Sequence, residues 1–206
     1  MRKVVRKELL LVAVSIAVLA ISHVFASVFV YYPVTVNLSP VSPPIKFLAG
    51  SNANQNDLGG GGSPYVSNTI GVTIGSDGAS LTLTLHPTKQ HNYYGNVSLI
   101  QNTDGKAYYI TIRVNTAASL PSGSVARLLI YNAPSGGTKV ADVSLLATGD
   151  TSATATISAS GNPGSVWRID LYIFIPEGST ASATSASLQL IYSPSNEAPP
   201  NPVPPS

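Results

Sequence analysis

The chain has 206 residues, of which 44% are hydrophobic and only 10% are charged, and it contains no cysteine. This composition can build the core of one ordinary domain, and it excludes disulfides, iron–sulfur clusters and thiol catalysis. Four of the 11 Lys and Arg residues lie within residues 2–7, so residues 27–206 carry 7 basic and 8 acidic side chains. Such a charge balance provides no basic patch for nucleic acid.

The first 26 residues are typical of a secretory signal peptide. The basic residues precede an apolar run from Leu9 to Ser22, and Val24-Phe25-Ala26 places apolar or small side chains before a cleavage site between Ala26 and Ser27. We therefore expect residues 1–26 to be removed and the protein to be extracellular. An uncleaved anchor is the alternative, because residues 9–32 are a nearly unbroken apolar stretch long enough to span a bilayer.

Residues 27–38, SVFVYYPVTVNL, alternate in the manner of a β-strand. In an extended chain the even-numbered side chains share one face, and all of them are apolar or aromatic: Val28, Val30, Tyr32, Val34, Val36 and Leu38. Pro33 removes one backbone donor, which an edge strand tolerates. The stiff Pro-rich spacer of residues 39–44 would let this strand reach another molecule. The alternative is that residues 27–38 form the first strand of the chain's own sandwich.

Residues 45–193 are predicted to form one all-β domain, an antiparallel β-sandwich of jelly-roll or Greek-key type. Alternating apolar and polar residues are separated by Gly, Pro, Asn and Asp, which is typical of such sandwiches. The expected strands are residues 65–74, 80–86, 93–101, 107–115, 124–132, 138–147, 152–159, 166–175 and 184–193. The Pro-rich residues 194–206 are expected to form an extended tail.

The alternation also predicts which side chains face the core. In strand 166–175 the inward face should hold Trp167, Ile169, Leu171, Ile173 and Ile175, and in strand 107–115 it should hold Tyr108, Ile110, Ile112 and Val114. Strand 166–175 is apolar on both faces near its end, so it is either central or covered by a neighbouring subunit. The tyrosine pairs 31/32, 93/94 and 108/109 should each place one ring on either face of a strand.

No set of residues suggests a catalytic, cofactor or metal site. His86 and His91 have no nearby carboxylate to complete a metal site, and Asp57 is the only carboxylate beside Asn52-x-Asn54-x-Asn56. Phosphate-loop, hydrolase and zinc-protease motifs are absent from the sequence. We therefore expect no enzymatic activity, no cofactor and no small-molecule substrate, and we interpret Asp57 as part of a solvated turn.

Two smaller features concern single side chains. Asn37-Leu38-Ser39 and Asn96-Val97-Ser98 are sequons for N-glycosylation, and we favour Asn96 because a glycan on Asn37 would obstruct insertion of the strand. Of the acidic residues, only Asp170 is expected in the middle of a strand, where Arg168 or another exposed cation would pair with it.

In layout the chain resembles the archaeal bundling pilins, which are similar to the bacterial TasA/camelysin biofilm-fibre proteins. The resemblance rests on the signal ending in VFA, the mature start SVFVYYPVTVNL, the Pro spacer and the cysteine-free β-domain, and it includes no short diagnostic motif. It implies a jelly-roll subunit whose N-terminal strand inserts into the groove of the next subunit. The even-numbered residues of 28–38 would form the inserted face, and the filaments would bundle laterally to hold cells together.

Two functions of different kinds follow. The first is a secreted structural subunit that polymerises head to tail with copies of itself. The second is a monomeric, secreted or membrane-anchored surface domain that acts as an adhesin or binds cell-surface glycans through its tyrosines.

Overall fold

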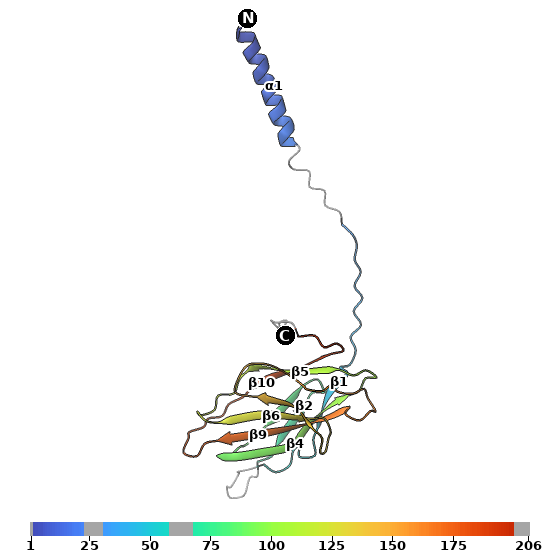
Figure 1. The fold of residues 1–206 in the computed structure, drawn as a ribbon, viewed down its shortest axis with the longest axis vertical. Coiled ribbons are helices and arrows are strands. Elements are labelled where there is room, and N and C mark those ends of the chain that lie inside the picture. Colours follow the sequence, from blue (N-terminus) through green and yellow to red (C-terminus); the bar gives the residue numbers. More distant parts are fainter. Residues whose placement is uncertain (1, 23–30, 58–67, 200–206) are drawn as a thin grey trace. The chain divides into compact units, whose positions relative to one another are not determined.

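The computed structural model describes residues 2–22, 31–57 and 68–199, and the chain divides into two units, residues 1–40 and 41–206. The first unit contains one helix in its described residues, α1 (Arg2–Ser22) (Figure 1). In the described ranges, no helix has both the length and the hydropathy that crossing a bilayer requires. The predicted cleavage site, Ala26 and Ser27, and the first residues of the predicted strand, Val28 and Val30, lie outside the described residues.

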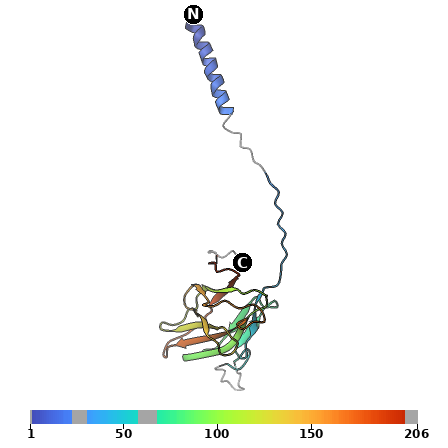
Figure 2. The same cartoon turned by 45° about the vertical axis from the view of Figure 1, so that its right-hand side comes forward.

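The described part of the second unit contains ten strands, which form an antiparallel β-sandwich (Figures 1 and 2). They are β1 (Ile45–Ala49), β2 (Gly71–Ile74), β3 (Leu81–Thr84), β4 (Gln90–Asn102), β5 (Tyr109–Thr116), β6 (Val125–Tyr131), β7 (Lys139–Ser144), β8 (Gly149–Ser152), β9 (Val166–Ile175) and β10 (Ser187–Ser193). A five-stranded sheet has the order β1-β4-β9-β6-β7, a three-stranded sheet has the order β10-β5-β8, and β2 pairs with β3 alone.

The core lies between these sheets and is built from alternating side chains, as predicted. The five inward residues expected on β9 are all buried, and so are the four expected on and beside β5. β9 lies between β4 and β6 in the middle of the five-stranded sheet, and on its outer face Phe174 stacks on His91. Trp167 on this strand is completely buried and is the largest such side chain in the described core.

Several strand boundaries differ from the predicted ones. β1 was not expected, and the predicted strand 152–159 is replaced by β8 at residues 149–152, with Ile157 joined to Tyr108 only by an isolated bridge. In the described part of the predicted strand 65–74, the regular ladder is confined to β2. β4 is longer than predicted and contains a bulge, because the register with β9 shifts between Tyr94 and Ser98.

Candidate assembly interface

The described part of the alternating N-terminal segment, residues 31–38, belongs to no helix or strand. Its even-numbered side chains are exposed in the single chain: Tyr32 82%, Val34 82%, Val36 71% and Leu38 84%. The first strand of the described sandwich is β1. A series of large apolar side chains in water is typical of a surface that binds another protein.

Two sides of the sandwich are closed by hydrogen bonds between neighbouring backbone segments. On one side the Thr154 N–H donates to the Val140 carbonyl oxygen at 2.7 Å, which ties the segment after β8 to β7. On the other side the Phe47 N–H of β1 donates to the Gly78 carbonyl oxygen at 2.8 Å, in the turn between β2 and β3. The chain before β2 also reaches the outer edge of this hairpin, where the Val72 N–H donates to the Asn54 Oδ1 at 3.3 Å.

In the described part of the domain, no backbone hydrogen bond joins the outer edge of β3 or of β10 to another segment. Each of these strands is bonded to one neighbour only, β3 to β2 and β10 to β5. The apolar side chains beside these edges pack on the core but stay only half-buried, namely Leu81 and Leu83 on β3 and Leu188 and Leu190 on β10. An unpaired edge with apolar neighbours is a template for an added strand.

A buried carboxylate fixes the bulge of β4 against β9. Asp170 on β9 accepts hydrogen bonds from the Tyr93 hydroxyl at 2.5 Å and from the Asn96 N–H at 2.6 Å, and the Arg168 Nε lies 2.9 Å from it. Its side chain is almost fully buried, although the sequence predicted an exposed pair. Partial burial and the bond to Asp170 raise the pKa of Tyr93 above its ordinary value. The predicted pairing with Arg168 is confirmed.

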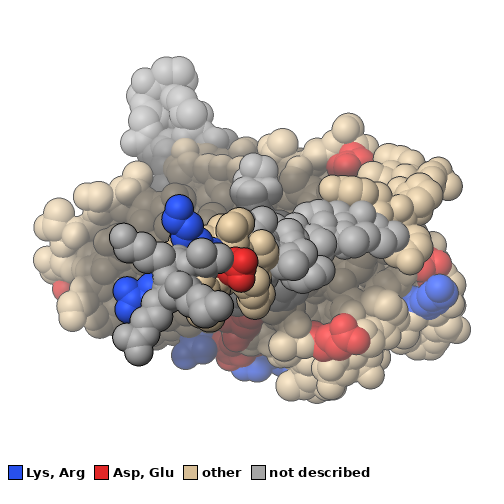
Figure 3. Space-filling view, turned by 90° about the horizontal axis from the view of Figure 1, so that it is seen from above, with Lys and Arg blue, Asp and Glu red and all other residues tan. Residues whose placement is uncertain are grey.

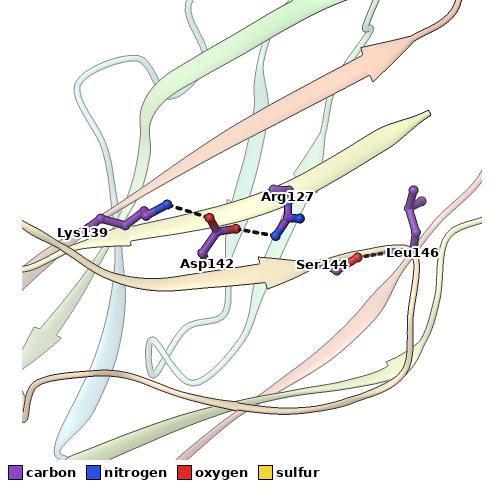
Figure 4. A network of polar contacts seen from close by, with 5 residues as sticks. All are labelled: Arg127, Lys139, Asp142, Ser144 and Leu146. Carbon is purple, nitrogen blue, oxygen red and sulfur yellow. Dashed lines mark hydrogen bonds and ion pairs between the residues drawn. The ribbon is translucent and has the colours of Figure 1, made fainter. Parts of the chain in front are cut away.

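Two more carboxylates, which were not expected within strands, lie in β7 and β8 and are held there by cations. Asp142 on β7 accepts hydrogen bonds from the Arg127 Nη1 at 3.0 Å and from the Lys139 Nζ at 2.6 Å (Figure 4). Partial burial raises the pKa of Asp142, but the bonds from Lys139 and Arg127 outweigh it and hold this pKa below its ordinary value. On β8, two hydrogen bonds from the Arg113 guanidinium at 2.5 and 2.7 Å likewise lower the pKa of Asp150.

His86 and His91 have separate partners. The His86 Nδ1 lies 3.0 Å from the Asp57 carboxylate, which also accepts a hydrogen bond from the His86 N–H at 2.7 Å. The Asp57 side chain is almost fully buried, so the prediction of a solvated turn was wrong for this residue. His91 stacks on Phe174 with 4.6 Å between ring centroids and shares a 2.6 Å hydrogen bond with the Tyr172 hydroxyl.

The sequons lie in different environments. Asn96 belongs to the β4 bulge, has a positive φ of 48°, and its side-chain amide donates to the Pro134 carbonyl oxygen at 3.3 Å. Asn37 is exposed. The Asn96 side chain is thus held within the fold, and the choice between the two sequons stays a prediction.

The tyrosine pairs within the sandwich confirm the predicted alternation. Tyr93 is 57% exposed whereas Tyr94 is 5% exposed, and Tyr109 faces outward whereas Tyr108 is buried. On the face seen in Figure 3, charged side chains are scattered among uncharged residues. No family model matches the chain, and neither does any curated protein.

Proposed function

We propose that the protein is a structural subunit of an extracellular filament, and that each copy adds its N-terminal strand to the sandwich of the next copy. The observation that carries the proposal is the exposure of Tyr32, Val34, Val36 and Leu38, four side chains that alternate along the chain and would share one face of a strand. The open edges of β3 and β10 support it from the acceptor side.

Apolar burial and the ordering of the segment nearly balance in such an addition, so pairing with an open sheet edge decides it. Burial of a large apolar side chain contributes about 1.5–3 kcal/mol, so the four exposed residues would contribute roughly 6–12 kcal/mol. Ordering the backbone opposes this by about 1–2 kcal/mol per residue, but Pro33 and the Pro-rich spacer already restrict the segment in the free chain. Backbone hydrogen bonds to an open edge then add to the balance in favour of assembly.

The contact joins different surfaces of two identical copies, so it is heterologous and generates an open filament. Following the resemblance to bundling pilins, we propose that these filaments associate laterally and hold cells together. The proposal places the protein outside the cell and assigns it no enzymatic activity.

A second candidate function is a monomeric surface domain that binds glycans. The cluster of His91, Tyr172 and Phe174 on the five-stranded sheet favours it, because stacked rings at a surface can contact the apolar face of a sugar. This function does not need residues 27–38, which separates it from the first.

The test is a variant that lacks residues 27–38, compared with the full chain by electron microscopy and sedimentation. We expect filaments from the full chain and a folded, soluble, unpolymerised domain from the variant. An added SVFVYYPVTVNL peptide should bind this domain, whereas a peptide of the same composition with its alternation broken should not. Filaments from the shortened variant would contradict the proposal, and so would a failure of the peptide to bind.

A further inference from the structure

The layer that faces the five-stranded sheet is divided in its middle. β8 lies beside β7 at one side of the sandwich, and β2 lies beside β1 at the other. From the first side the order is β8, β5 and β10. From the second side it is β2 and then β3, because β1 lies beside β2 and the outer Val72 N–H of β2 donates to the Asn54 Oδ1 at 3.3 Å. The open edges of β10 and β3 therefore face each other across the layer.

β10 and β3 are not neighbours in a sheet. Adjacent strands lie about 4.8 Å apart and are joined by backbone hydrogen bonds, whereas these two strands belong to separate sheets. Half-buried apolar side chains flank this division. On β5, next to β10, the inward side chains of Ile110 and Ile112 are buried, but the corresponding leucines of β10 and β3 are only half-buried.

We infer that one strand is missing from this layer and that residues 32–38 of a second copy of the chain fill its place, paired with β10 on one side and β3 on the other. This inference rests on the proposed function and adds the site that accepts the strand. Other edges are unsuited, because backbone hydrogen bonds already tie β1 to the β2–β3 turn and the segment after β8 to β7.

The segment matches this site in length and pattern. Residues 32–38 and β10 both have seven residues, so a single strand of about 23 Å pairs along the whole of β10. Tyr32, Val34, Val36 and Leu38 would cover the half-buried leucines, while Thr35 and Asn37 would face outward like the threonines of β3. β3 has only four residues, so it pairs with only part of the inserted strand. Where the inserted strand has no partner on the β3 side, the missing N–H of Pro33 leaves no hydrogen bond unmade.

Engineered disulfides test this placement in the full chain, which has no cysteine of its own. Thr35→Cys is combined in turn with a cysteine at each outward position of β10 (residues 187, 189, 191 and 193) and of β3 (Thr82 and Thr84). Ser152→Cys on β8, the other edge of the same three-stranded sheet, is the matched control. A disulfide needs Cα atoms within about 7 Å, so only adjacent strands can be linked.

After mild oxidation of polymers verified by electron microscopy, a non-reducing gel should show a ladder of covalent multimers for at least one position on β10 and one on β3, and none for Ser152→Cys. The placement would be overturned by filaments that are linked through β8, through only one of β10 and β3, or at none of these positions. Each of these results would leave the proposed function standing. If the cysteine-free chain forms no filaments, the proposed function itself fails and this inference with it.

Discussion

Val34 lies at the centre of the exposed apolar series, and replacing it tests assembly without disturbing the folded domain. In the single chain its side chain is 82% exposed and belongs to no strand or helix. Val34→Ala and Val34→Asp should therefore leave the unfolding free energy of the unpolymerised protein unchanged within about 0.5 kcal/mol. Any larger effect appears only when the side chain becomes buried in a neighbouring subunit.

The size of that effect follows from the burial. Val34→Ala removes two carbon atoms, worth about 0.8 kcal/mol each, so each contact between subunits weakens by about 1.6 kcal/mol and the critical concentration for polymerisation rises roughly 15-fold. Val34→Asp loses the whole side-chain contribution and also buries a carboxylate, which costs several kcal/mol. A total loss of about 5 kcal/mol per contact corresponds to more than a thousandfold rise in the critical concentration, so filaments should be absent.

Sedimentation of polymers over a concentration series measures the critical concentration. Thr35→Asp is the matched control, because it adds the same charge to the neighbouring residue on the opposite face of the strand and should have a much smaller effect. Equal loss of filaments in Val34→Asp and Thr35→Asp would refute the assignment of the even-numbered face, and normal filaments from Val34→Asp would refute burial of the segment altogether.

Three further predictions concern the domain itself. Asp170→Asn should reduce the unfolding free energy by about 3–5 kcal/mol in urea denaturation, because it removes a buried charge from its cation. Asp142→Asn, at a more exposed carboxylate, should reduce it by no more than about 1 kcal/mol. Equal losses in the two variants would contradict the role of burial. Gly50→Ala should destabilise the folded domain by about 1–3 kcal/mol, because the added Cβ would lie 2.0 Å from a backbone oxygen of β4. The Cβ added by Gly105→Ala would meet nothing within 4 Å, so this control should unfold at the wild-type urea midpoint. The pKa values of Asp142 and Asp150 are lowered in the folded state, so their contribution to stability is complete above the unfolded-state pKa of about 3.9 and is lost as the pH falls through the folded-state pKa values. The urea midpoint, measured between pH 6 and pH 2, should therefore fall in that acidic window. The Asp142→Asn variant should show a shallower fall of its urea midpoint.

The faces of long strands could be predicted from the sequence because alternation of apolar residues depends only on neighbouring positions. β9 illustrates this: the side chains predicted to point inward, including Trp167, are buried, and the bounds of the strand match residues 166–175. The tyrosine pair 93/94 likewise has one exposed and one buried ring.

The remaining features depend on residues far apart in the chain. Asp170 is buried because its partners, Tyr93 and the Asn96 N–H, come from β4, more than 70 residues earlier. Asp57 is buried beside His86, which is 29 residues away. β1 is only five residues long and follows a Pro-rich spacer, so alternation could not reveal it; its position depends on pairing with β4.

The open edges were equally invisible to the pattern, because Leu81 and Leu83 alternate with threonines in the same manner whether or not a strand lies beside them. Alternation assigns a side chain to a face, but it does not say which strand is the neighbour in the sheet. For the candidate interface, the sequence could predict the apolar face of residues 32–38 but not the open edges of β3 and β10.

The β2–β3 hairpin forms a sheet of its own, and this has a mechanical consequence. Two-stranded hairpins are barely stable in water by themselves, and backbone bonds hold this one to the domain along β1 and the chain before β2. Its amide hydrogens should therefore exchange with solvent at a lower opening free energy than those of β9, which is flanked on both sides. We therefore expect a pulling force to open this hairpin before it opens the five-stranded sheet.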